Sequence, residues 1–184
     1  MAEQSKMVAL GSAAPDFALP DTGSGRIVTL EELADSPAVL VAFLCNHCPY
    51  VKHVLDGFVS FARDYGPRGL AVVAISANDA EAFPDDAPPE MAKLAKARQF
   101  PFPYLYDESQ AIAAAYGAAC TPDFFLFDRD RHLAYRGQFD SSRPRGTTPV
   151  TGGDLRAAVD AVLEGRAPST EQFASVGCSI KWRE

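Results

Sequence analysis

Short apolar runs alternate along the chain with segments in which apolar residues recur at helical spacing. Residues 37–44 form a nearly unbroken apolar run, which is typical of a strand covered on both faces. Residues 51–65 then place apolar side chains three or four positions apart, as an amphipathic helix does. Residues 69–76 repeat the apolar run. The alternation predicts an α/β domain whose strands are joined by crossover helices.

The rest of the chain continues the same pattern. We expect residues 1–184 to form one domain, with a flexible N-terminus over residues 1–10 and a C-terminal extension over residues 168–184. Between these ends the residues predict a hairpin within 11–33, a loop over 78–89, helices over 90–99, 109–116 and 153–163, and strands over 102–107, 123–127 and 132–137.

Composition narrows the class of protein. The hydrophobic fraction of 47% and the charged fraction of 22% are those of an ordinary globular chain. The net charge of −7 argues against a nucleic-acid partner, because phosphate binding needs clustered Lys and Arg. No apolar stretch is long enough for a membrane span, and the first residues do not resemble a signal peptide. We therefore expect a cytoplasmic protein without a membrane partner.

The cysteines carry the strongest chemical signal. Four cysteines are too few to staple a chain of this length, so local chemistry is expected of them. Cys45 and Cys48 form a Cys-x-x-Cys motif between a buried strand and a helix, where the helix N-terminus stabilises a thiolate. A cationic His47 between them would lower the pKa of Cys45. The motif predicts a redox-active pair with His47 as a third functional residue.

A metal site is the main alternative for these cysteines. The motif could be half of a zinc site completed by Cys120, Cys178 or a histidine. The chain has no second Cys-x-x-Cys motif and no paired histidines at ligand spacing. We therefore expect neither a metal nor another cofactor. Inert, buried cysteines are the remaining alternative.

Four segments of the chain resemble the thioredoxin-fold redoxins, and more narrowly the peroxiredoxin-like branch related to alkyl hydroperoxide reductase and thiol-specific antioxidant proteins. The resemblance implies a thioredoxin-like fold, with a central mixed β-sheet flanked by helices, an N-terminal hairpin and a C-terminal tail. It also implies that Cys45 is the attacking thiol and Cys48 its resolving partner. The segments are Ala-Pro-Asp-Phe-Ala-Leu (14–19), Phe-Leu-Cys-Asn-His-Cys-Pro-Tyr-Val (43–51), Tyr-Gly-Ala-Ala-Cys-Thr-Pro-Asp-Phe (116–124) and Gly-Cys-Ser-Ile-Lys-Trp (177–182).

The third of these segments contains the dipeptide Thr121-Pro122. It matches the family's cis-proline loop, which lies across from the cysteine pair and offers backbone groups to an extended substrate. A proline directly before a strand agrees with this assignment. Cys120 would then lie near the same pocket, either as an additional redox thiol or as filler beside the loop.

Two departures from the family pattern limit the mechanism. Thioredoxins carry a buried acid on the strand before the motif, whereas residues 37–44 contain no carboxylate, so proton transfer would need water or another group. Peroxiredoxins carry Thr or Ser three residues before the peroxidatic Cys. Here Ala42 stands three residues before Cys45, and Cys45 itself three before Cys48.

These observations favour a thiol–disulfide oxidoreductase that acts on protein or small-molecule disulfides and is reduced by an external thiol system. A thiol peroxidase is the alternative enzyme, with Cys45 attacking a peroxide and Cys48, Cys120 or Cys178 condensing with the sulfenic acid. A non-catalytic domain that senses redox poise or binds a partner is the third hypothesis. The sequence leaves the oligomeric state open.

Overall fold

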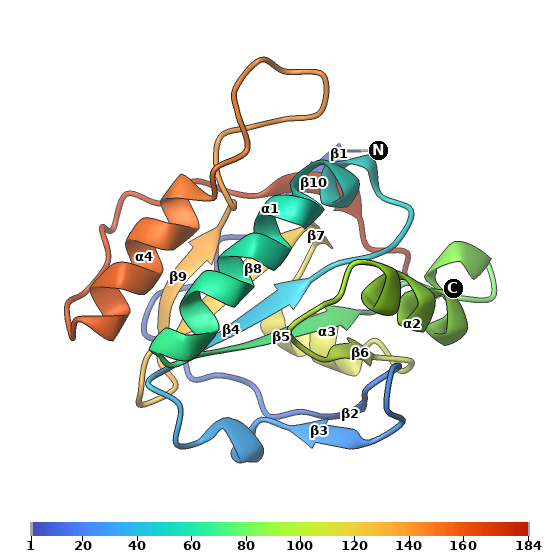
Figure 1. Cartoon of the computed structure of the whole chain (residues 1–184), viewed down its shortest axis with the longest axis horizontal. Helices are drawn as coiled ribbons and strands as arrows, with labels where there is room; N and C mark the ends of the chain where they lie inside the picture. Colours follow the sequence, from blue (N-terminus) through green and yellow to red (C-terminus); the bar gives the residue numbers. More distant parts are fainter. Residues whose placement is uncertain (1, 184) are drawn as a thin grey trace.

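A five-stranded mixed sheet forms the centre of the molecule. The computed structural model describes residues 2–183 (Figure 1). Parallel pairing joins β4 to β5 and β5 to β6, whereas β8 runs antiparallel to β4, and β9 to β8. This confirms the expected mixed sheet. Its strands, in spatial order, are β6 (Tyr104–Tyr106), β5 (Leu70–Ser76), β4 (Ala38–Phe43), β8 (Asp123–Phe127) and β9 (Leu133–Gly137).

Helices cover both faces of this sheet. Apolar side chains of α1, α2 and α4 share one core with one face of β4, β5 and β8, and α1 and α4 lie side by side across that face (Figure 1). A second core on the opposite face contains α3 and the N-terminal segment. None of the helices described is long and apolar enough to cross a membrane. Their bounds are α1 (Pro49–Tyr65), α2 (Pro88–Ala97), α3 (Ala111–Tyr116) and α4 (Gly153–Leu163).

Two helix starts show how proline positions the chain. Helix α1 begins at Pro49 and α2 at Pro88, because proline has no N–H to lose in the first turn and its φ is already helical. The start of α2 at Pro88 shifts this helix two residues toward the N-terminus from the predicted 90–99. Short 3-10 turns occur at η1 (Glu31–Leu33), η2 (Gly66–Arg68) and η3 (Pro84–Asp86).

The predicted hairpin is present as β2 (Ala18–Pro20) and β3 (Ile27–Thr29), which pair antiparallel. Asp21 closes its turn, since the Asp21 carboxylate accepts bonds from the backbone and hydroxyl of Ser24. The other oxygen of this carboxylate accepts the backbone N–H of Tyr104, which ties the hairpin to β6. The hairpin therefore belongs to the fold rather than to a loose tail.

Both ends of the chain enter a second, three-stranded sheet that the residue pattern did not predict. Strand β10 (Val176–Ser179) lies between β1 (Ala2–Gln4) and β7 (Cys120–Thr121), antiparallel to both (Figure 1). Residues 2–4 of the segment expected to be flexible are thus a paired strand, while residue 1 lies outside the described residues. Short strands with little apolar alternation carry a weak sequence signal, and tertiary pairing decides them.

Candidate active site

The cysteine motif lies where the central strand meets the first helix. Cys45 follows β4, and Cys48 has the extended backbone of a helix N-cap immediately before Pro49. The Cys48 carbonyl accepts the first bond of α1, from the N–H of Lys52 at 3.0 Å. Both cysteine side chains are 0% exposed. The pair is therefore held at a helix N-terminus, as the sequence predicted, but beneath the surface.

Thr121 brings the two sulfurs together from a distant part of the chain. Its hydroxyl Oγ1 lies 3.3 Å from Cys45 Sγ, and its carbonyl accepts a bond from Cys48 Sγ at 3.2 Å. The Thr121–Pro122 peptide bond is cis. The loop that the family resemblance placed opposite the cysteines therefore contacts both of them.

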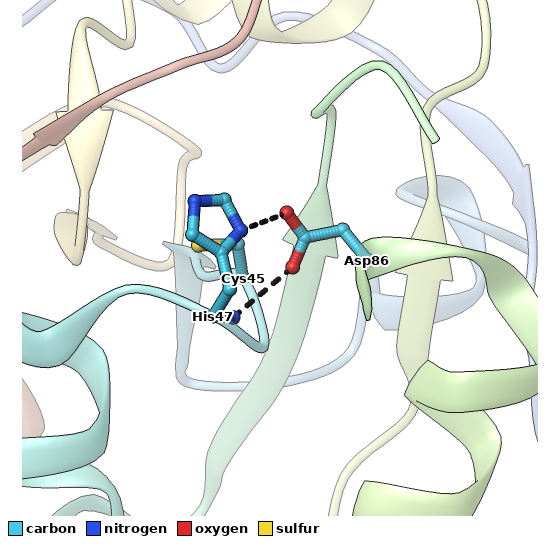
Figure 2. Close-up of side chains that lie close together, drawn as sticks. All are labelled: Cys45, His47 and Asp86. Atoms are coloured by element: carbon cyan, nitrogen blue, oxygen red, sulfur yellow. Dashed lines mark hydrogen bonds and ion pairs between the residues drawn. The ribbon is translucent and has the colours of Figure 1, made fainter. Parts of the chain in front are cut away.

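Asp86 is the organising carboxylate on the other side of the motif. It is fully buried and accepts the backbone N–H of Asn46 at 2.7 Å and of His47 at 3.2 Å. The same carboxylate bonds His47 Nδ1 at 2.5 Å and Asn78 Nδ2 at 2.8 Å. Figure 2 shows Asp86 reaching both the ring and the backbone of His47, with Cys45 behind the ring. Four donors on one carboxylate fix the backbone of the motif.

Two contacts orient the ring of His47. One ring nitrogen is bonded to Asp86, and the ring stacks on Phe83 with centroids 5.5 Å apart and planes at 11°. The negative charge of Asp86 also acts on Cys45, where it opposes a thiolate. His47 thus acts in a pair with a carboxylate, which the sequence argument for an isolated cation beside Cys45 did not include.

The two cysteines have opposite electrostatic environments. The hydrogen bond to Cys48, then burial, then the charge of Asp86 raise the pKa of Cys45 far above that of a free thiol. The interaction with Cys45 is also the main cause that lowers the pKa of Cys48 to about 5, and Cys178 and the N–H of Val51 add to it against the effect of burial. The hydrogen bond from Cys48 to the Thr121 carbonyl acts in the other direction, because it favours the protonated form of Cys48. The two thiols thus shift each other's pKa in opposite directions, and the role of Cys45 as the attacking thiol stays a prediction.

One cluster in the described part of the chain has donor atoms suited to a metal ion. Cys45 Sγ, a ring nitrogen of His47 and a carboxylate oxygen of Asp86 all lie within 4.8 Å of one another. Thiolate, imidazole and carboxylate are the usual ligands of zinc. An ion here would compete with the N–H donors that already bind Asp86, because those donors hold the motif in place.

The remaining two cysteines differ in position. Cys120 is fully buried with its sulfur 3.8 Å from the Pro122 carbonyl and 4.0 Å from that of Ser175, and burial raises its pKa. Among the hydrogen bonds of residues 2–183, none joins Cys120 to the motif. Cys178 is half-buried and packs against the core that contains Cys45 and Cys48. A redox role for Cys120 stays a prediction.

The sequence argument missed two buried carboxyl groups. Asp86 lies in a predicted loop rich in Asp, Ala and Pro, and nothing in that composition distinguishes it from its exposed neighbour Asp85. Asp123 is fully buried on β8 opposite Phe43, and neither of its oxygens has a hydrogen-bond partner among the described residues. Burial raises the pKa of Asp123 well above the usual range. It is thus an acid beside the site, although residues 37–44 contain none.

Fold and site together define a thiol-based redox protein with a thioredoxin-like fold. A family model described as AhpC/TSA family matches residues 10–136, and the chain belongs to this family. It is an oxidoreductase whose chemistry is that of thiols. A search of curated proteins finds no match.

Two solved structures resemble the chain over nearly its whole length. An uncharacterized conserved protein from Geobacillus kaustophilus is 52% identical with a TM-score of 0.98, over 100% of this chain and 97% of that one. A hypothetical protein from Sinorhizobium meliloti 1021 is 55% identical with a TM-score of 0.96, over 98% of each chain. A thiol:disulfide interchange protein of the thioredoxin family from Chlorobium tepidum TLS is 19% identical with a TM-score of 0.64, over 84% of this chain and 98% of that one, and shares the fold.

Proposed function

We propose that this protein is a thiol–disulfide oxidoreductase in which Cys45 and Cys48 alternate between a dithiol and a disulfide. The observation that carries the proposal is the contact of both sulfurs with Thr121, 3.3 Å from Cys45 and 3.2 Å from Cys48, at the start of a helix. Both sulfurs contact the same residue, and the pKa of the Cys48 thiol is about 5. Such a pair is suited to disulfide exchange near neutral pH.

The opposite pKa shifts of the two cysteines support an order for the two steps of the reaction. The family resemblance makes Cys45 the attacking thiol, but the pKa of Cys45 is raised and that of Cys48 lowered. We therefore assign the first attack to the Cys48 thiolate, which bonds to one sulfur of a substrate disulfide and expels the other as a thiolate. Cys45 then attacks the Cys48 sulfur, releases the substrate as a dithiol and leaves a Cys45–Cys48 disulfide. An external thiol reductant restores the pair.

Buried Asp86 beside the pair supports the proposed disulfide exchange. Asp86 holds the backbone of Asn46 and His47, so the spacing of the sulfurs is fixed before substrate arrives. Protein or small-molecule disulfides remain the proposed substrates, and the cytoplasm, where thiols are normally reduced, the proposed compartment.

Trapping of a mixed disulfide tests both the reaction and the order of attack. Cys45→Ser and Cys48→Ser are each made with Cys178→Ala, so that this half-buried thiol takes no part. A disulfide-containing polypeptide such as insulin should become trapped on Cys48 in the first variant and stay free in the second. Turnover should fall on the order of 1000-fold in both.

Trapping on Cys45 alone would reverse the order of attack. If neither variant forms a mixed disulfide and wild-type protein does not reduce insulin, thiol–disulfide exchange is refuted. Cys120→Ala is the matched control, because its sulfur has no bond to the motif; it should trap nothing and retain turnover.

A thiol peroxidase is a second function that one observation favours. Cys45 stands three residues before Cys48, the position where peroxiredoxins carry a Thr or Ser hydroxyl, and it lowers the pKa of Cys48. The Cys48 thiolate would then attack a peroxide and become a sulfenic acid, which Cys45 condenses with. Consumption of hydrogen peroxide by Cys45→Ser, with sulfenic acid on Cys48 and no trapping of insulin, would favour this function over disulfide exchange.

A further inference from the structure

One edge of the strand that contains Thr121 is occupied by the protein's own C-terminal strand. Strand β10 pairs antiparallel with β7, with Cys178 opposite Thr121 and Ser179 opposite Cys120. The outer edge of β10 is covered in turn by β1. A cysteine of the chain itself therefore stands across from the residue that contacts both motif sulfurs.

Gly177 shows that this approach is close. A Cβ atom at this position would lie 1.9 Å from the Thr121 carbonyl oxygen and 2.6 Å from its carbon. Both atoms belong to the backbone, so no side-chain rotation relieves the clash. Glycine is therefore required for the backbone of β10 to pack against the Thr121–Pro122 loop.

Cys178 is also placed against the motif by its side chain. It packs on the core that contains Cys45 and Cys48, and its thiol and backbone N–H help to lower the pKa of Cys48. Burial raises the pKa of Cys178 itself to about 11. The sulfur of Cys178 is thus a proton donor to a neighbouring thiolate. It is also half-buried, whereas both motif sulfurs are 0% exposed.

We propose that Cys178 is a third redox thiol, which forms a disulfide with Cys48 and so moves the disulfide from the buried pair toward the surface. This rests on the proposed function, which supplies the Cys45–Cys48 disulfide. The Cys178 sulfur attacks Cys48, the Cys48–Cys178 bond forms, and the Cys45–Cys48 bond breaks. Cys45 leaves as a thiolate and takes the proton that Cys178 gives up. The step exchanges one disulfide for another, so it needs no oxidant or reductant.

The exchange has a functional consequence. A Cys45–Cys48 disulfide joins two sulfurs that are both 0% exposed. A disulfide at Cys178 presents a half-buried sulfur instead. Cys178 is thereby the point at which an external thiol attacks, and Cys45 is meanwhile restored as a thiol.

Disulfide mapping in a variant without Cys45 tests the inference. The reduced Cys45→Ser protein keeps three of the four cysteines. On oxidation with diamide, we expect it to lose two of its three free thiols and to yield a peptide pair joined through Cys48 and Cys178. Cys45→Ser with Cys120→Ala should form the same disulfide, whereas Cys45→Ser with Cys178→Ala should keep both remaining thiols.

Two outcomes would overturn the inference: Cys45→Ser retains all three thiols, or it closes a disulfide that includes Cys120. Circular dichroism of the reduced variant, repeated with Cys45→Ala, ensures that a negative result comes from folded protein.

The single variant Cys178→Ala separates this inference from the proposed function. If it closes Cys45–Cys48 and turns over insulin while Cys45→Ser closes nothing, only the role of Cys178 fails. If Cys178→Ala closes no disulfide while Cys45→Ser joins Cys48 to Cys178, the proposed function fails and the Cys178 disulfide stands.

Discussion

The two cysteines of the motif have different surroundings, which we call the Cys45 flank and the Cys48 flank. On the Cys45 side, the loop before α2 contributes the buried carboxylate of Asp86, whose charge opposes a thiolate at Cys45. On the Cys48 side, the N–H of Val51 in α1 and the N–H and thiol of Cys178 in β10 help to lower the pKa of Cys48. One flank presents negative charge, and the other presents hydrogen-bond donors.

The motif alone therefore does not set the pKa of either thiol. Both cysteines are equally buried, and both contact Thr121. What separates them is supplied by Asp86 and Cys178, which lie 38 and 130 residues beyond Cys48 in the sequence. Variants on each flank should therefore change one sulfur more than the other.

Removing the Cys45 thiol should have the largest effect, and this effect is on the pKa of Cys48. Cys45→Ala deletes the bond that contributes most to the lowered pKa of Cys48, so this pKa should rise from about 5 toward the ordinary value of about 8.5. The full shift corresponds to about 5 kcal/mol. The ultraviolet absorbance of the thiolate, followed against pH in reduced protein, measures it: wild type should ionise as the pH rises through about 5, and the variant several units higher. Equal titration curves would contradict the assignment of charge to Cys48.

A steric clash between β10 and the Thr121–Pro122 loop should have the second-largest effect, on the free energy of unfolding. Gly177→Ala forces a Cβ atom against the Thr121 carbonyl, and overpacking of this kind lowers the free energy of unfolding by about 1–3 kcal/mol. Gly66→Ala is the matched control, since its φ of −52° is helical and no atom lies within 4 Å of the added Cβ. Urea denaturation compares the two. Equal stability would mean that β10 does not need its close approach to the loop.

Removing charge from the opposite flank should have a smaller effect. Asp86→Asn, made together with Cys48→Ala so that only Cys45 titrates in the motif, should lower the pKa of Cys45 by about one unit, or about 1.4 kcal/mol. Asp85→Asn in the same background is the control, because Asp85 is exposed and adjacent in sequence. Alkylation rate against pH gives both values. An unchanged pKa in Asp86→Asn would leave burial as the main cause.

Removing the Cys178 thiol on β10 should have the smallest of the four effects, again on the pKa of Cys48. Cys178→Ala removes one secondary donor to Cys48 and keeps the bonds from Cys45 and Val51, so the pKa of Cys48 should rise by less than about one unit. Cys120→Ala should leave the same titration unchanged. A shift as large as that of Cys45→Ala would mean that Cys178, not Cys45, is the principal donor.

Local patterns predicted the parts of the site that are continuous in sequence. The apolar run of β4 and the helical spacing of α1 placed Cys45 and Cys48 correctly at a strand–helix junction. The matched Thr121-Pro122 dipeptide was expected opposite the pair, and Thr121 contacts both sulfurs. These predictions hold because periodicity and the strand–helix junction are properties of neighbouring residues.

The unpredicted parts depend on long-range packing. Asp86 resembles any acidic residue of a polar loop until α2 packs and places its carboxylate beneath Asn46 and His47. Strand β10 has only four residues and exists because β1 and β7 pair with it. The opposite pKa shifts of Cys45 and Cys48 depend in part on both segments, which the sequence argument based on His47 did not include.

The small sheet has a consequence for how the protein is handled. Strand β1 begins at Ala2 and is separated from Thr121 only by β10, so the first residues of the chain stand two strand spacings, about 10 Å, from the residue that holds both sulfurs. An affinity tag fused ahead of Ala2, or the scar left by its cleavage, would therefore sit beside the reactive centre. Thiol titrations of tagged and untagged protein are not interchangeable until they have been compared.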